Sequence, residues 1–206
     1  MDTVENVLKS GRPKKDADFK EHVFSLLLQH GRPKHLRSSD WTHQQYLDVA
    51  DELKQLARDN ADGSIDGFAK ALESPHSLTR KVAVEMLNEL ATSSEVAEGR
   101  QAERIREFVK RALADANRKV RCSTINTIRN MAIDDNVKRK EFAPLMVDLL
   151  ADASKRVRGM APWVLSKWPE SVPLEAAARV LVMEDPQASH GLRMLTNEII
   201  SAPNSH

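Results

Sequence analysis

The side chains in this sequence that are best suited to chemistry are arginines, and their chemistry is ion pairing. Arginine recurs near the start of successive predicted helices, at Arg80, Arg121, Arg158 and Arg193. A guanidinium can hold a carboxylate through two parallel hydrogen bonds. Asp115 stands six residues before Arg121, and Asp152 stands six before Arg158. We expect each arginine to pair with an aspartate in a turn of its own helical unit or of the adjacent one. These arginines and aspartates, Asp115, Arg121, Asp152 and Arg158 among them, would then form a structural ladder that ties successive units together. A row of arginines facing a ligand is the alternative.

A second group of cations is hidden by the overall charge. Residues 100–158 contain 15 Lys and Arg against 8 Asp and Glu, a net charge of +7, although the whole chain carries only +1. We define a basic ridge by five of these cations: Arg111, Arg118, Lys119, Lys155 and Arg156. Such a ridge could bind an acidic protein segment or a phosphate backbone. An ordinary solvated helix surface is the third interpretation.

Other polar patterns favour structural interpretations. The segments GRPKK (11–15) and GRPKH (31–35) resemble half of an AT-hook, but Ser10 and His30 stand where that element has arginine. Glycine followed by proline favours a helix stop in both places. Four histidines gather near the N-terminus without metal-binding spacing: His22, His30, His35 and His43. The sequence has no GxSxG, P-loop or GxGxxG motif. We therefore expect no catalytic residue, no metal and no cofactor.

The composition indicates helices. Of 206 residues, 41% are hydrophobic and 30% charged, whereas aromatic residues make up only 4%. Good helix formers dominate. The single cysteine, Cys122, excludes an intrachain disulfide and fits a reducing compartment. The apolar runs are far shorter than the roughly 20 residues that a membrane helix needs. We expect a cytoplasmic or nuclear protein without a membrane span.

The elements that must position these residues follow from apolar spacing. Helices are predicted over about 16–30 and over 40–58, the second with Asp40 as N-cap. The polar segment 60–67 (NADGSIDG) predicts a break, so residues 1–62 form a predicted N-terminal helical cap. Residues 63–206 form the predicted repeat array, with units at about 64–93, 95–133, 137–169 and 173–201.

An internal repeat carries the fold prediction. When Leu72, Leu113 and Leu150 are aligned, matching apolar positions follow at Leu87, Ile128 and Leu165, and again at Leu90, Met131 and Trp168. The spacings of 41 and 37 residues are typical of two-helix solenoid units. Asn117 and Ser154 are predicted caps of the second helices. A looser fourth unit places Leu192-Arg193, Thr196 and Ile200 in the later positions.

Residues 113–132 (LADANRKVRCSTINTIRNMA) and 149–168 (LLADASKRVRGMAPWVLSKW) resemble HEAT repeats, a HEAT-like or armadillo-like α-solenoid family. The resemblance extends over about 64–201. It implies an all-α fold, a right-handed α-α superhelix, with a turn aspartate and an early arginine recurring in each unit. Asp115 with Arg121 and Asp152 with Arg158 match this pattern, whereas Ser74 replaces the aspartate of the first unit.

The resemblance and the charges predict a non-catalytic scaffold or adaptor for protein–protein interaction. Its groove would accept a helix or an extended peptide, and its basic residues would steer an acidic partner. The alternative is a nucleic-acid-binding HEAT-like protein. HEAT-like DNA glycosylases for alkylated bases use Trp and Asp on a concave basic surface. This chain resembles them in architecture alone, with Trp163 as the residue of interest and Trp168 in a predicted core position.

Overall fold

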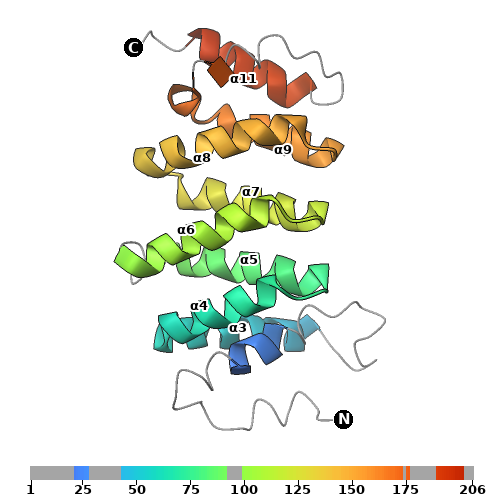
Figure 1. Ribbon diagram of the computed structural model, residues 1–206, viewed down its shortest axis with the longest axis vertical. Helices are drawn as coiled ribbons and strands as arrows, with labels where there is room; N and C mark the ends of the chain where they lie inside the picture. Colours follow the sequence, from blue (N-terminus) through green and yellow to red (C-terminus); the bar gives the residue numbers. More distant parts are fainter. Residues whose placement is uncertain (1–20, 28–42, 92–98, 174, 177–188, 202–206) are drawn as a thin grey trace.

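The computed structural model describes residues 21–27, 43–91, 99–173, 175–176 and 189–201, and all regular structure within them is helical (Figure 1). The longer helices are α3 (His43–Asp59), α4 (Ala61–Leu72), α5 (Ser77–Ala91), α6 (Gly99–Leu113), α7 (Arg118–Met131), α8 (Asn136–Asp148), α9 (Lys155–Leu165) and α11 (Ser189–Ser201). Short 3-10 turns follow α8 and α9, at η2 (Leu149–Ala151) and η3 (Pro169–Ser171). The predicted all-α class is confirmed for the described residues.

The helices form stacked pairs. Figure 1 shows them following one another along the long axis in chain order. Helix α4 pairs with α5, α6 with α7, and α8 with α9. The second helices of these pairs also pack on one another, α5 on α7 and α7 on α9. We call the surface of these three helices the second-helix face. The predicted helical-repeat solenoid is confirmed.

The interior is continuous from the N-terminal helices through the repeats. The matched side chains of Leu87, Ile128 and Leu165 are 0% exposed, and Trp168 is only 2% exposed. Each side chain of this kind contributes about 2 kcal/mol through burial. Leu53 of α3 belongs to the same apolar cluster as these residues. A short helical pair cannot cover its apolar stripe alone, so the stack is held together by contacts between units.

The predicted break over residues 60–67 is wrong. Helix α4 begins at Ala61, because the Asn60 side chain accepts a hydrogen bond from the Gly63 amide at 2.9 Å. Gly63 and Gly67 are buried in this helix, so their small size serves packing rather than a turn. The division into a cap and an array remains a prediction, although the described part of 1–62 shares the core of the repeats.

The end of the stack departs from the repeat pattern. Ile200 is 70% exposed, so its assignment to a buried position of the fourth unit is wrong, whereas Leu195 of α11 is fully buried. Helix α11 packs on α9 and contacts η3, and Figure 1 shows it as the last described helix of the stack. Asp40, both GRPK segments and the turn before α11 lie outside the described residues. None of the described helices has both the length and the apolar character to cross a membrane.

Candidate functional site

Two arginines of the structural ladder, Arg80 and Arg121, each join two units. Arg80 donates to Asp115 from Nε at 2.6 Å and from Nη2 at 2.9 Å. Arg121 donates to Asp152 in the same way, with both distances at 2.7 Å. The Arg121 and Asp152 side chains are only 12% and 8% exposed. Of the two pairings expected from the sequence, the structure therefore has the one with the adjacent unit: the arginine reaches the turn that follows its own.

Arg80, Arg121 and Arg158 also bind the turns of their own units. Nη1 of Arg121 donates to the carbonyl oxygens of Asp115 at 2.6 Å and Ala116 at 3.1 Å. Arg158 contacts Asp152 and Ala153 in the same way, at 2.8 and 3.2 Å. With its donors directed into the stack, the ladder is better suited to joining units than to holding a ligand.

The turn aspartates also stabilise the turns themselves. Asp115 accepts the Asn117 amide and Asp152 accepts the Ser154 amide, both at 2.7 Å. Ser74 occupies the equivalent place in the first unit, where its hydroxyl accepts the His76 amide at 3.2 Å. The serine therefore keeps the turn hydrogen bond and gives up the charge. Asn117 is the N-cap of α7 as predicted, whereas Ser154 stands at the N-cap of α9 without a side-chain hydrogen bond.

The pairing of Asp115 with Arg80 predicts that the fold loses stability in acid. Burial raises the pKa of Asp115, but the hydrogen bonds from Arg80 and the Asn117 amide, with the nearby positive charges, outweigh it and lower the pKa overall. A carboxylate with a lowered folded-state pKa stabilises the fold above its unfolded pKa, about 3.9, and that stability is lost as the pH falls through the folded pKa. The free energy of unfolding should therefore fall below about pH 4. Urea unfolding of Asp115→Asn should show a shallower loss over this range, and equal slopes would contradict the assignment.

Several cations on the first helices of the pairs are neutralised by carboxylates of other elements. Arg104 of α6 pairs with Asp62 at 3.2 Å and also contacts Asp66, both on α4. Lys110 pairs with Glu141 of α8 at 2.9 Å. Arg106 also pairs with Glu141, at 3.4 Å, and Arg139 of α8 pairs with Glu170 of η3 at 3.3 Å. These cations, several of which contribute to the +7 of the middle segment, have structural partners.

The basic ridge behaves differently. Arg118 and Lys119 are the first two residues of α7, and Lys155 and Arg156 are the first two of α9. We call these four the helix-start cations. All four are exposed, and none forms an ion pair within the described part of the chain. Arg111, the fifth ridge residue, is exposed in the last turn of α6.

The electrostatics of Cys122 show that cations of α7 and α9 act on the same spot. Burial raises the pKa of the Cys122 thiol, and the positive charges of Arg156 and Arg118 are among those that oppose the shift. Cys122 lies one turn into α7. The charges of Arg118 and Arg156, from two consecutive units, therefore both act on this thiol.

The helix-start cations are unfavourable for the helices that carry them. The N-terminus of a helix has a partial positive charge, so cations in the first turn are repelled and anions are favoured. Arg111 differs, because a cation in the last turn is stabilised. None of the four charges on α7 and α9 forms an ion pair with a carboxylate of the described residues. Residues that oppose local stability are often there for function.

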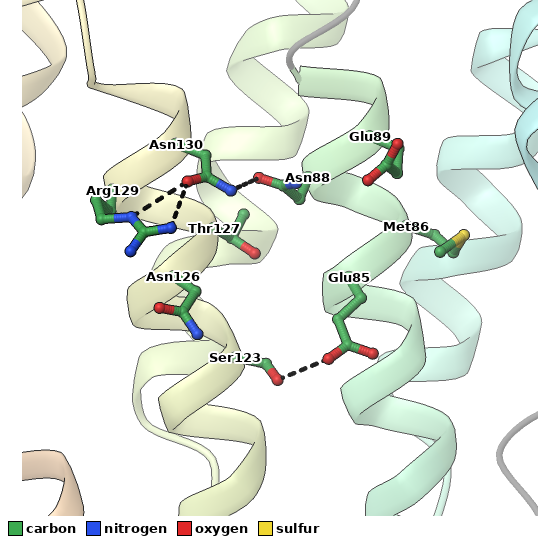
Figure 2. A pocket seen from close by; sticks show the side chains of 9 residues that line it. All are labelled: Glu85, Met86, Asn88, Glu89, Ser123, Asn126, Thr127, Arg129 and Asn130. Carbon is green, nitrogen blue, oxygen red and sulfur yellow. Dashed lines mark hydrogen bonds between the residues drawn. The ribbon is translucent and has the colours of Figure 1, made fainter. Parts of the chain in front are cut away.

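An open pocket of about 450 Å³ lies between α5 and α7 on the second-helix face. Its lining is mainly polar: Glu85, Met86, Asn88, Glu89, Ser123, Asn126, Thr127, Arg129 and Asn130. Two bridges between side chains join the helices, from Ser123 Oγ to Glu85 at 3.1 Å and from Asn130 Nδ2 to Asn88 at 3.2 Å, and Thr127 Oγ1 donates to the Val84 carbonyl oxygen at 3.4 Å. Figure 2 shows Asn126 between these bridges. Asn126 is exposed, and its carboxamide has no hydrogen-bond partner among the described residues.

The sequence analysis missed this pocket. Its α7 wall is a polar stripe of Ser123, Asn126 and Asn130, spaced as residues on one helix face are. That stripe was a signal that the sequence contained. The α5 wall carries Glu85 and Asn88, which lie 38 and 42 residues from their bridging partners.

Trp163 is half-buried beside the pocket, and Trp168 is in the core as predicted. The Arg129 guanidinium lies 5.4 Å from the Trp163 ring centroid, so a ring face that a flipped base would need is already covered.

Of the four N-terminal histidines, His22 lies in a described helix. Burial lowers the pKa of its imidazole, against the raising effect of Glu52. Within the described residues, no group of three or more potential metal ligands occurs.

Comparison with known proteins identifies the fold. No protein-family model and no curated protein matches the chain. Two engineered proteins of known structure are similar to it, one with a TM-score of 0.53 at 17% identity over 98% of both chains. The other has a TM-score of 0.54 at 14% identity, over 98% of this chain and all of the other.

A third similar structure is a designed armadillo repeat protein in complex with the peptide (KR)4. It has a TM-score of 0.50 at 17% identity and covers 88% of this chain and 83% of its own. At such identities the likeness shows the fold alone, which is a HEAT-like or armadillo-like helical-repeat solenoid.

Proposed function

We propose that this helical-repeat solenoid is a non-catalytic protein-interaction scaffold that binds its partner on the second-helix face. The observation that carries the proposal is the set of four exposed, unpaired helix-start cations at one end of that face. The designed armadillo protein holds a peptide, which supports peptide binding as a use of such a fold. The partner of this chain is acidic at the ridge, because acidic groups there would gain ion pairs that the chain itself does not provide.

A phosphate backbone is the rival ligand for the same cations. The pocket beside the ridge is lined by both acidic and basic side chains, Glu85, Glu89 and Arg129, and Glu85 is paired with Lys81 at 2.5 Å. It therefore does not continue the positive surface that a phosphate backbone would follow. A protein segment can place acids at the ridge and neutral groups in the pocket. The described surface therefore favours protein over nucleic acid, and no observation supports glycosylase chemistry at Trp163.

The charge argument makes a prediction about stability. Lys119→Glu and Arg156→Glu should each stabilise the folded chain, by about 0.5 kcal/mol at low ionic strength, because each places an anion at a helix N-terminus. Thermal unfolding would measure the gain, which salt should reduce. Lys140→Glu is the matched control, because residue 140 is exposed but lies inside α8 rather than among its first residues. A loss of stability at residues 119 and 156 would show that these cations have structural partners.

The proposed function can be tested by selecting peptides from a random dodecamer library on the immobilised full chain. Acidic binders should emerge, and the double variant Lys119→Glu/Arg156→Glu should bind them at least tenfold more weakly. Arg100→Glu/Lys140→Glu, which reverses two exposed cations elsewhere, should bind them normally. A labelled random DNA duplex provides the second arm. Failure to enrich any peptide, together with duplex binding that falls steeply with salt, would replace the scaffold by a nucleic-acid-binding protein.

A further inference from the structure

The pocket between α5 and α7 carries opposite charges on its two sides. Figure 2 shows Arg129 on the α7 side, and Glu85 and Glu89 on the α5 side. The other polar residues of the lining are neutral: Asn88, Ser123, Asn126, Thr127 and Asn130. A cavity of about 450 Å³ is large enough for a small molecule. Its charges suit a ligand that itself carries a negative and a positive group.

Arg129 is held in place by neutral groups and keeps its charge available. Its Nε and Nη2 donate to Asn130 Oδ1 at 3.3 and 3.1 Å, and its guanidinium lies over the Trp163 ring. Among the described residues it forms no ion pair, and no hydrogen bond from Nη1. A guanidinium that is already oriented can bind a carboxylate through charge-assisted hydrogen bonds with little further loss of side-chain freedom.

Asn126 adds neutral donors beside this guanidinium. It stands three residues before Arg129 on α7, and side chains at that spacing are neighbours on a helix surface. The carboxamide of Asn126 has two N–H donors, neither of which has an acceptor within the part of the chain that the structure describes. One carboxylate can therefore accept hydrogen bonds from Asn126 and Arg129 together. These two side chains form the anion-binding half of the pocket.

The α5 side provides the acceptors for a cation. Glu85 Oε1 accepts hydrogen bonds from Lys81 at 2.5 Å and from Ser123 at 3.1 Å, whereas Oε2 accepts none from a described residue. Lys81 does not line the pocket, and a partly exposed ion pair between residues four apart on a helix is weak. Glu89 adds a second carboxylate one turn further along α5. An ammonium group on the ligand would gain a charge-assisted hydrogen bond at Oε2, in a field to which both carboxylates contribute.

The two halves lie on different helices, which sets the length of the ligand. Packed helices have axes about 8–10 Å apart, and the side chains of each wall occupy part of that gap. An α-amino acid such as glycine has both charged groups on one carbon atom and cannot reach both walls. A chain of five methylene groups places a carboxylate and an ammonium group about 7 Å apart when extended. The arrangement therefore favours a zwitterion with widely separated charges.

We propose that the pocket binds a small linear zwitterion, with its carboxylate on Arg129 and Asn126 and its ammonium group on Glu85. Linear ω-amino acids belong to this class, and so does free lysine through its α-carboxylate and ε-ammonium groups. The inference goes beyond the proposed partner surface, because it assigns a second kind of ligand and uses none of the helix-start cations.

The test is a titration of the ¹⁵N-labelled full chain with 6-aminohexanoate, followed through chemical shifts. The side-chain amide of Asn126 and the Nε–H of Arg129 should shift and saturate at millimolar ligand. Hexanoate lacks the ammonium group, hexylamine lacks the carboxylate, and glycine holds its charges too close together. Each of these should bind at least tenfold more weakly, since each loses a hydrogen bond between charged groups.

Two isosteric variants test the two halves of the pocket. Asn126→Asp places a carboxylate beside Arg129, and Glu85→Gln removes the charge that would pair with the ammonium group. Each should weaken binding of 6-aminohexanoate at least tenfold, whereas Glu85→Gln should bind hexanoate as the unchanged protein does. Lys140→Glu, an exposed change on α8, is the control and should leave binding of 6-aminohexanoate unchanged.

The assignment is overturned if these two side chains show no shift, or if hexanoate or hexylamine binds as tightly as 6-aminohexanoate. Normal binding of 6-aminohexanoate by either variant would also contradict it. Asn126 is exposed and makes no hydrogen bond with a described residue, so Asn126→Asp should fold and melt as the unchanged protein does, which circular dichroism would verify. The outcome is independent of the peptide selection, so the zwitterion site and the proposed scaffold function can fail separately.

Discussion

Replacing Arg121 by alanine should lower the free energy of unfolding by about 2–4 kcal/mol, although the side chain lies in a turn region rather than in the apolar core. The substitution removes both hydrogen bonds to Asp152 and those to the turn carbonyls of Asp115 and Ala116. The Asp152 side chain, only 8% exposed, would be left with an uncompensated charge. Breaking one side of a largely buried pair costs more than the pair itself contributes. Urea denaturation followed by circular dichroism would measure the loss.

The control is Arg118→Ala, three residues earlier on the same helix. Arg118 is exposed and makes no ion pair with described residues, so its removal should change stability by less than about 0.5 kcal/mol. Adding Asp152→Asn to Arg121→Met should recover part of the loss, since the carboxamide oxygen can still accept the Ser154 amide. Equal stability of Arg121→Ala and the unchanged protein would show that the ladder does not join the units.

Replacing Ile128 by alanine should cost about 2–5 kcal/mol, because it opens a cavity at the middle of the stack. Ile128 is 0% exposed and belongs to the core cluster that also contains Leu87 and Leu165 of the adjoining units. The expected loss therefore includes contacts on both sides of α7. Chemical denaturation should show a lower midpoint with an unchanged slope if the array still unfolds as one cooperative unit.

Ile133 provides a matched control, since it is 58% exposed just beyond the end of α7. Ile133→Ala changes the same number of atoms without opening an interior cavity, and should cost less than about 0.5 kcal/mol. Similar losses at residues 128 and 133 would mean that the repeat positions do not form a common interior.

The core was predictable because the sequence supplies its own comparison. Three copies of one apolar pattern placed Leu87, Ile128 and Leu165 in equivalent positions, and all three are buried. The fourth copy was predicted by extension, and there Ile200 proved exposed. At the end of a stack no further described unit covers the outer side of a helix, so the pattern loses the packing that makes it informative.

The partner of each ladder arginine could not be chosen from the sequence. Asp115 stands six residues before Arg121, yet its carboxylate pairs with Arg80 of the preceding unit. Both arrangements satisfy the same motif, and only the offset between stacked turns distinguishes them. The start of α4 was predicted wrongly for a local reason. The glycines in 60–67 suggested a turn, whereas the Asn60 cap and close packing favour a helix.

The α7 stripe pointed to one wall of the pocket, but its pairing with α5 could not be predicted, for a related reason. The pocket is built from side chains of two helices, and the hydrogen bonds that hold it together join residues 38 and 42 positions apart. The basic ridge, by contrast, came from matched positions in consecutive units. Only the structure could distinguish these unpaired cations from the paired ones of α6 and α8, because the carboxylates that neutralise the paired cations come from neighbouring units.

The most direct test of binding on the second-helix face is an amide chemical-shift map of the ¹⁵N-labelled full chain, recorded as a selected peptide is added. Shifts should concentrate in residues 119–130 of α7 and 85–89 of α5, with the side-chain amide of Asn126 among the largest. Shifts confined to α4, α6 and α8, with those of α5 and α7 unchanged, would place the partner on the opposite helices and contradict the account.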